Sequence, residues 1–268
     1  MKKRLLALAA AAMMITGLFT GCGSKGGSDL DYVKTNGELK IGITLFDPMN
    51  YYDPENPEKL IGFDTEMAEA VCEKLGVTPK FVVIDWNQKL VELKSKNIDC
   101  VWNGMSILEE LKPEVDYSDA YSANMQVCVV KKENLDKLST LDAMQSAKLV
   151  AEAESAGQKT IAADEFLSKA AFTAVPTQQD TLLEVKSGTA DVAVLDAVMA
   201  YASVGESTSF SDLAVVPNIE LSKEEYGIGF RKGSDLVPQV NNALKELTEN
   251  GTVAAIAEKY PSVLVTLK

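Results

Sequence analysis

Residues 90–104 read LVELKSKNIDCVWNG, and residues 182–196 read LLEVKSGTADVAVLD. Each copy has the pattern of a helix end, a tight turn and a buried strand. The repeat therefore predicts two similar lobes built from the same strand–helix unit, although two ordinary αβ units can also resemble each other by chance. Identical residues recur at a constant offset of 92, in the pairs Leu90 and Leu182, Glu92 and Glu184, Lys94 and Lys186, Ser95 and Ser187, and Asp99 and Asp191.

Short apolar runs alternate with helical patterns along the rest of the chain. Strands are predicted over residues 39–43, 80–84, 98–102, 126–130, 149–151, 192–195 and 228–230. Helices are predicted over residues 64–75, 86–96, 158–169, 179–187, 197–203, 236–249 and 252–259. In the first helix, Asp64 is placed to cap the start and Gly76 to end it. This alternation predicts an α/β protein with parallel, doubly wound sheets.

Polar residues follow the strands of both repeat copies. The first strand ends at Asn103-Gly104-Met105-Ser106, and the second ends at Leu195-Asp196. In open parallel sheets, ligands bind beyond the carboxyl ends of the strands. If the two lobes face each other across a cleft, these two strand ends face each other too, and a ligand site is expected between them.

The N-terminus has the pattern of an export signal. Met1-Lys2-Lys3-Arg4 is basic, and an apolar stretch follows that is too short for a comfortable transmembrane helix. The small residues before Cys22 resemble a bacterial lipobox, so residues 1–22 are predicted to be a lipoprotein signal peptide with Cys22 lipidated. The alternative is an ordinary cleaved signal with an incidental cysteine. The Gly/Ser-rich start of residues 23–36 predicts a flexible tether.

Composition narrows the functional classes. After the signal the chain carries 23 basic and 39 acidic residues, a net charge of −16, which argues against nucleic acid as a partner. It contains no histidine, so the commonest general base and metal ligand are missing, and neither a metal nor a cofactor is expected. Three further cysteines without CxxC spacing are expected to be small buried hydrophobic residues, namely Cys72, Cys100 and Cys128.

Several short motifs, in order along the chain, carry a family resemblance. The sequence resembles the extracellular solute-binding proteins of polar amino-acid ABC transporters over nearly all of the chain after the signal. Each motif alone is weak, and the series together is specific for the family but not for a ligand. The motifs are Gly37-Glu38-Leu39-Lys40-Ile41-Gly42, Gly62-Phe63-Asp64, Gly104-Met105-Ser106-Ile107, Asp116-Tyr117-Ser118-Asp119, Tyr226-Gly227-Ile228, Arg231-Lys232-Gly233 and Asn250-Gly251-Thr252.

The resemblance implies a type II periplasmic-binding-protein fold, with two doubly wound lobes that close around a ligand by hinge motion. Lobe 1 is expected over residues 37–122 and 225–268, and lobe 2 over residues 126–222. The implied protein is a monomer without catalytic residues. It is anchored by lipid on the extracytoplasmic face of the cell membrane and passes an amino acid or related amine to an ABC transporter permease.

The resemblance also implies which residues bind the solute. Phe46 and Trp86 match aromatic positions that sandwich the ligand side chain, unless both are core aromatics. Within Asn103–Ser106, which includes Met105, the Gly104 carbonyl is expected to bind the ligand ammonium. Ser106 is expected to bind its carboxylate. The alternative for this segment is a plain loop after a strand.

Lobe 2 is expected to contribute charge. Asp196 matches the aspartate that pairs with the ligand α-ammonium, and a helix N-cap is its alternative or additional role. Glu152 and Ser155 match a loop that also reaches the cleft. Leu111 stands where the family usually has a carboxylate-binding arginine. The ligand is therefore expected to be either an α-amino acid held by main-chain donors or an amine, amide or peptide-like compound.

Two other functional classes compete with solute delivery. Dehydratase-type enzymes resemble this fold, but the absence of histidine and of a nucleophile–base pair argues against catalysis. A ligand-sensing module of a signalling receptor is the second alternative, against which the lone lipid anchor argues.

Overall fold

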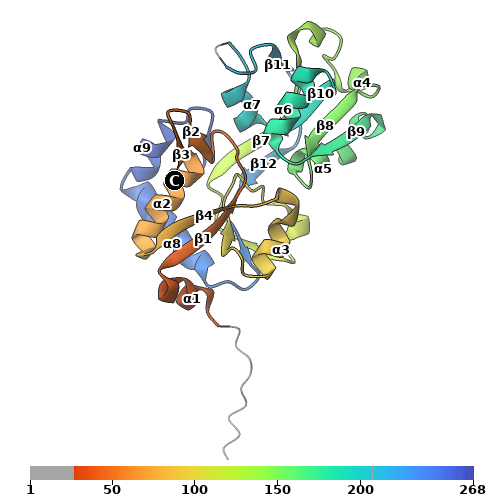
Figure 1. Cartoon of the computed structure of the whole chain (residues 1–268). Helices are drawn as coiled ribbons and strands as arrows, with labels where there is room; N and C mark the ends of the chain where they lie inside the picture. Colours follow the sequence, from red (N-terminus) through yellow and green to blue (C-terminus); the bar gives the residue numbers. More distant parts are fainter. Residues whose placement is uncertain (1–26, 207) are drawn as a thin grey trace, which may run out of the picture.

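The computed structural model describes residues 27–206 and 208–268, which form two lobes, each built around a sheet (Figure 1). In lobe 1 the strand order is β4-β1-β5-β13-β6. Its strands are β1 (Glu38–Ile43), β4 (Thr78–Val83), β5 (Cys100–Val101), β6 (Val115–Tyr117) and β13 (Gly229–Arg231). A separate hairpin is formed by β2 (Tyr51–Asp53) and β3 (Asn56–Ile61).

Helices cover both faces of the lobe 1 sheet. On one face lie α2 (Phe63–Leu75), α8 (Leu236–Glu249) and α9 (Thr252–Ala257) (Figure 1). On the other face lies α3 (Lys89–Lys94), which directly follows the 3-10 turn η1 (Trp86–Gln88) in the chain. Phe63, Met67 and Val71 share one face of α2 and are fully buried, so the apolar period of this helix forms much of the core. Gly76 adopts the left-handed conformation and ends α2, as predicted.

Lobe 2 has the strand order β11-β7-β10-β8-β9. Its strands are β7 (Ser122–Lys131), β8 (Lys148–Glu152), β9 (Ala171–Val175), β10 (Val192–Asp196) and β11 (Leu213–Val215). Its helices are α4 (Leu141–Met144), α5 (Ala156–Ala163), α6 (Gln178–Ser187) and α7 (Ala197–Ser203). Strand β10 is buried along its whole length, which fits its apolar run over residues 192–195, and the buried Asp196 ends it.

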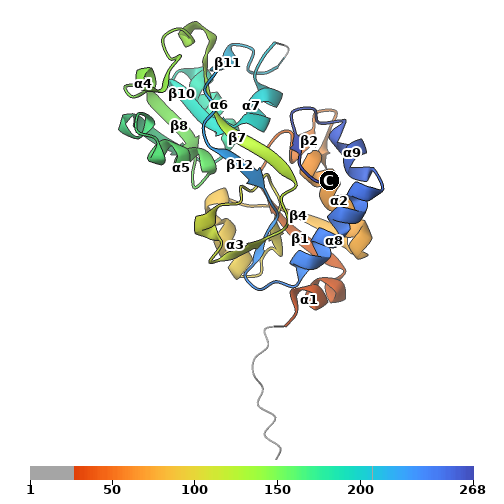
Figure 2. The same ribbon diagram turned by 180° about the vertical axis from the view of Figure 1, so that it is seen from behind.

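Two antiparallel strands run between the lobes. Strand β7 leaves lobe 1 after Tyr121, and β12 (Lys223–Tyr226) pairs with its first half (Figure 2). The short strand β14 (Leu264–Val265) pairs with β7 as well. The chain therefore passes between the lobes twice, through β7 and through β12.

The repeat in the sequence corresponds to a repeat in the structure. The first copy forms α3 and β5, and the second forms α6 and β10, and each strand is the middle one of its sheet. In lobe 1 the Asp99 carboxylate accepts a hydrogen bond from the Lys40 N–H at 3.0 Å. In lobe 2 the Asp191 carboxylate accepts one from the Lys148 N–H at 2.8 Å. The matched aspartates therefore tie equivalent neighbouring strands, and the prediction of two similar lobes is confirmed.

Three expectations need correction. The sheets are mixed rather than parallel, because β13 in lobe 1 and β7 in lobe 2 enter from the other lobe and run antiparallel to the middle strands. Gly62 is the N-cap of α2, whereas Asp64 lies one residue inside the helix and is fully buried. Residues 29–36 of the predicted tether form α1 (Asp29–Asn36), capped by the Ser28 hydroxyl and packed through Val33.

The three cysteines at positions 72, 100 and 128 are free and buried, as predicted. The predicted signal peptide and Cys22 lie outside the described residues. Within residues 27–206 and 208–268, no helix combines the length and the apolar composition that crossing a membrane requires.

Candidate functional site

A small cavity of about 20 Å³ lies where the strand ends of the two lobes meet. Eight of the ten sequence-predicted ligand residues line it, which brings the two strand ends together as expected. Lobe 1 contributes Thr44, Phe46, Trp86, Asn103, Gly104 and Ser106. Lobe 2 contributes Glu152, Ser155, Ala156, Gln178 and Asp196. We call these eleven residues the cleft.

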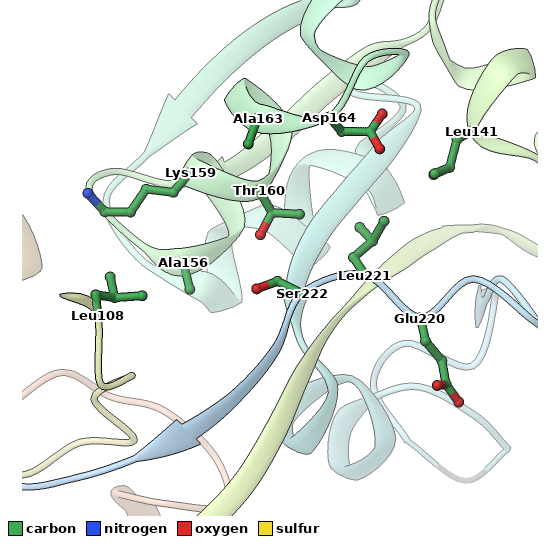
Figure 3. A pocket seen from close by; sticks show the side chains of 10 residues that line it. All are labelled: Leu108, Leu141, Ala156, Lys159, Thr160, Ala163, Asp164, Glu220, Leu221 and Ser222. Carbon is green, nitrogen blue, oxygen red and sulfur yellow. The ribbon is translucent and has the colours of Figure 1, made fainter. Parts of the chain in front are cut away.

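A larger hollow of about 520 Å³ lies beside α5 and the segment that leads into β12 (Figure 3). Its charged side chains already have partners. Lys159 pairs with Glu110, and the Asp164 carboxylate accepts hydrogen bonds at 2.9 Å from two main-chain N–H groups. Glu220 pairs with Lys223 at 3.3 Å. This hollow therefore offers a ligand fewer unused polar groups than the cleft does.

Asp196 ends β10 and is buried in the cleft. Its Oδ1 accepts hydrogen bonds from the side-chain amides of Asn124, at 2.7 Å, and Gln126, and its Oδ2 accepts one from Gln178. It stands at the N-cap position of α7, but its side chain makes no capping hydrogen bond. The carboxylate is therefore held by amides and aimed at the cleft rather than used by the helix.

A second carboxylate shares these amides. Glu224 of β12 accepts hydrogen bonds at 2.6 Å from both Asn124 and Gln126 through its Oε1. Burial, followed by the negative charge of Glu224, raises the pKa of Asp196 to about 8. A cation placed against Asp196 would relieve both effects, so this end of the cleft favours a positively charged group.

Glu152 ends β8, next to β10 in the lobe 2 sheet. Its side chain is buried, and its Oε1 has no hydrogen-bond partner. Burial and then the charge of Asp196 raise the pKa of Glu152 well above its usual range. Lys89 opposes this shift through its charge alone, since no hydrogen bond joins the two side chains. The cleft thus contains two carboxyl groups from neighbouring strands.

Asp64 holds in place the part of the cleft that lobe 1 contributes. Its Oδ2 accepts hydrogen bonds from the Gly104 N–H at 2.7 Å and from the Tyr121 hydroxyl at 2.9 Å. Burial raises the pKa of Asp64 to about 7. Gly104 has a φ of +56°, and a Cβ at this position would lie 2.6 Å from a ring carbon of Phe46. Only glycine therefore allows the aromatic ring and this loop to pack so closely.

Asn103 and Ser106 have different roles in this part of the cleft. The Asn103 side chain makes four hydrogen bonds, to the main chain and hydroxyl of Thr44 and to Asn50. All its donor and acceptor capacity is used within lobe 1, so its side chain shapes the cleft and has nothing left for a ligand. Ser106 forms a bridge with Tyr226 through the main chain, and no hydrogen bond of its hydroxyl is found among the described residues.

The opposite side of the cleft contains the start of α5. Ser155 caps this helix by accepting a hydrogen bond from the Gln158 N–H at 3.2 Å. A Cβ on Gly157 would lie 2.6 Å from the Val194 carbonyl oxygen, so glycine lets the first turn approach β10 closely. The helix N-terminus is consequently held at the cleft, where its N–H groups favour anionic groups.

Two predicted ligand residues do not line the cleft. Met105 is buried in the lobe 1 cluster that includes Leu93, Ile98 and Val115. Leu111, in the 3-10 turn η2 (Glu109–Leu111), is half-buried and packs against the same cluster. Leu111 therefore packs against apolar side chains within lobe 1 instead of facing the cavity.

Three residues of the cleft were not predicted from the sequence, namely Thr44, Ala156 and Gln178. Thr44 directly follows a predicted strand, so the strand-end rule that selected Asn103 applies to it as well. The partners of Asp196 and Glu152 were missed too. Asn124, Gln126, Glu224 and Lys89 are far from these residues in sequence, and no local pattern connects them.

Comparisons with known proteins give one consistent result. Residues 39–262 match the bacterial extracellular solute-binding proteins, family 3. The chain is 30% identical to the arginine-binding extracellular protein ArtP of Bacillus subtilis (strain 168), over 97% of this chain and 98% of that protein.

Solved structures agree with the sequence match. A mutant of ArgBP from T. maritima is similar with a TM-score of 0.79 and 30% identity, over 87% of this chain and 99% of that one. The ancestral amino acid-binding protein AncCDT-1, a precursor of cyclohexadienyl dehydratase, is similar with a TM-score of 0.78 and 30% identity, over 87% and 99% of the chains. The fold of this chain therefore occurs both in proteins named as amino acid-binding proteins and in the precursor of an enzyme.

Proposed function

The chain belongs to the bacterial extracellular solute-binding proteins, family 3, and from this premise we propose that it captures an α-amino acid between its lobes and delivers it to an ABC transporter permease. The observation that carries the proposal is the position of Asp196, a buried carboxylate at the meeting point of two strand ends. Such a group is costly without a cationic partner, and an α-ammonium supplies one.

The α-carboxylate of the solute needs donors other than arginine. The described residues contain one arginine, Arg231, which is 3.0 Å from Asp29 and 3.1 Å from Asp99 in lobe 1. We propose that the Ser106 hydroxyl, Ser155 and the N-terminus of α5 hold the carboxylate. Main-chain N–H groups at a helix start suit this role. The sandwich of the ligand side chain by Phe46 and Trp86 completes the proposed site.

Capture requires the lobes to separate. A cavity of about 20 Å³ has room for about one water molecule, so the solute enters only when the cleft widens. We propose that the hinge lies at the crossings near residues 121–125 and 222–226. Lobe 1 then comprises residues 37–122 and 225–268, and lobe 2 comprises residues 126–222. Closure of the two lobes about these crossings would bury the solute.

We further propose that Cys22 carries the lipid that retains the protein, as a monomer, at the outer face of the membrane. The proposal rests on the basic and apolar residues before Cys22 and the Gly/Ser-rich residues after it. Expression of the full chain with Cys22→Ala, followed by fractionation, tests it. The variant is expected in the soluble fraction, and retention at the wild-type level would contradict the anchor.

A dehydratase-type activity is the competing function, because AncCDT-1 is a precursor of a dehydratase. The sequence contains no histidine, and the proposed site uses its carboxyl groups to bind a cation. We therefore propose binding without chemistry. Incubation of the purified protein with amino acids and with dehydratable hydroxy acids, followed by chromatography, is expected to return the compounds unchanged.

A thermal-shift screen tests the proposed function. Amino acids, amines, amides, small peptides and organic acids are added to the purified protein, and a solute that binds the folded state raises the melting temperature by mass action. At least one α-amino acid is expected to raise it more than its decarboxylated amine does. Stabilisation by organic acids alone would contradict the proposal, since they lack an ammonium for Asp196.

A further inference from the structure

We propose that Glu152 is a second counter-ion in the cleft, and that the solute is a basic amino acid whose side-chain ammonium or guanidinium it binds. This inference rests on the proposed function and makes it more specific. The observation that supports it is the burial of the Glu152 carboxyl group in the cleft. Only 3% of the Glu152 surface is exposed, the side chain lines the cleft, and Oε1 is buried without a hydrogen-bond partner.

Lys89, whose charge acts on Glu152, already donates its hydrogen bonds to other groups. Lys89 Nζ donates hydrogen bonds to the Trp86 carbonyl oxygen at 3.1 Å and to the Glu154 carbonyl oxygen at 3.2 Å. It also lies 4.7 Å from the centre of the Trp86 ring. Lys89 therefore binds main-chain groups at the edge of the cleft and leaves the Glu152 carboxyl free for a ligand.

The remaining charged groups around Glu152 are mostly acidic. Asp196 lies on the neighbouring strand, Asp85 precedes η1 and Asp180 belongs to α6. On α5, Lys159 pairs with Glu110 of lobe 1 and with Glu154 at 3.9 Å. A neutral solute would leave this region with excess negative charge, whereas a cationic side chain offsets it.

The two carboxyl groups reach the same cavity from the ends of neighbouring strands, and the charge of Asp196 acts on Glu152. Strands β8 and β10 are parallel neighbours, with Val150 opposite Ala193, and both end at the cleft. Neighbouring strands are about 4.8 Å apart, so one small solute spans both ends. With its α-ammonium at Asp196, a basic amino acid can fold its side chain toward Glu152. Phe46 and Trp86 supply apolar and aromatic surface for the alkyl chain or the guanidinium.

Matched ligands and variants test the inference. L-arginine and L-citrulline have nearly the same shape but differ in side-chain charge, as do L-lysine and L-norleucine. Titration calorimetry with wild type is expected to show the charged member of each pair binding at least about 30-fold more tightly, the usual minimum for a buried charge pair. Glu152→Gln should remove most of this preference while citrulline affinity changes by less than about threefold. The exposed neighbour Glu154→Gln should retain the preference.

The outcomes separate the two proposals. Equal binding of arginine and citrulline by wild type overturns the role of Glu152 but leaves the proposed function intact. A Glu152→Gln variant that keeps the full wild-type preference also overturns the role of Glu152, because a buried glutamate of purely structural function would behave this way. If none of the amino acids binds wild type, the proposed function itself fails. If Glu152→Gln does not fold, the ligand pairs on wild type alone decide the question.

Discussion

The side-chain nitrogen of Lys89 lies 3.2 Å from the main-chain oxygen of Glu154, so a hydrogen bond joins lobe 1 to lobe 2 at the edge of the cleft. Lys89 is buried although it is a lysine, and Glu154 has a φ of +56°. The ion pair between Lys159 and Glu110 connects the lobes on the same side. These contacts exist only when the lobes are together, so they contribute to the free energy of closure.

The first prediction concerns Lys89. Lys89→Met should weaken L-arginine binding by about tenfold or more, because a hydrogen bond from a charged donor contributes about 1.5–3 kcal/mol. The same substitution at Lys94, an exposed residue of α3 that pairs with Glu114 within lobe 1, is the matched control. Small-angle scattering should show a larger average radius for Lys89→Met than for wild type or Lys94→Met. Equal radii and affinities would mean that this contact does not influence closure.

The second prediction uses the two tryptophans. Trp86 lines the cleft, whereas Trp102 belongs to the main core cluster beside Tyr121. Opening exposes Trp86 to water and closure shields it, so L-arginine should change the intrinsic fluorescence. Trp86→Phe should remove most of this change, and Trp102→Phe should preserve it. If the change disappears in Trp102→Phe instead, the movement that accompanies binding is centred within lobe 1 and not at the cleft.

The third prediction concerns pH and the ligand-free protein. Burial raises the pKa of Asp64 to about 7, and burial together with Glu224 raises that of Asp196 to about 8. In the unfolded chain both ionise near pH 4, so between about pH 4 and 8 the folded state binds more protons. The free energy of unfolding should therefore fall as pH rises through this window.

Urea unfolding at pH 5, 6.5 and 8 tests whether the free energy of unfolding falls as pH rises. The wild-type midpoint should be highest at pH 5, and Asp196→Asn should show a smaller decrease because its amide does not titrate. Glu225→Gln, an exposed change on β12, should retain the wild-type slope. A wild-type midpoint that increases toward pH 8 would show that these carboxyl groups are ionised in the folded protein.

Much of the fold could be predicted because its determinants are local or repeated. The seven predicted strands and seven predicted helices all overlap observed elements, since short apolar runs indicated the strands and a period of 3.6 in the apolar residues indicated the helices. The sequence repeat, which includes the matching aspartates Asp99 and Asp191, predicted the two lobes. The hairpin of β2 and β3 was missed because its residues are mostly exposed and carry no apolar alternation.

The site was predicted less completely, for a physical reason. Strand ends identified Asn103, Gly104 and Asp196, and the family resemblance added Phe46 and Trp86. The residues that tune the charge of the cleft come from the crossings and from the opposite lobe. Glu224 is on β12, and Lys89 reaches across from α3. Such contacts depend on how the lobes dock, which local sequence patterns do not encode.

Titration calorimetry of L-arginine into wild type and Asp196→Asn tests the central claim most directly. Removing one partner of a buried charge pair costs about 2–5 kcal/mol, so affinity should fall by about 30-fold to several thousand-fold. Glu225→Gln makes a matching carboxyl-to-amide change at an exposed position and should bind as wild type does. Circular dichroism confirms that each variant is folded. Wild-type affinity in folded Asp196→Asn would contradict the claim that an amino acid is held in the cleft by this carboxylate.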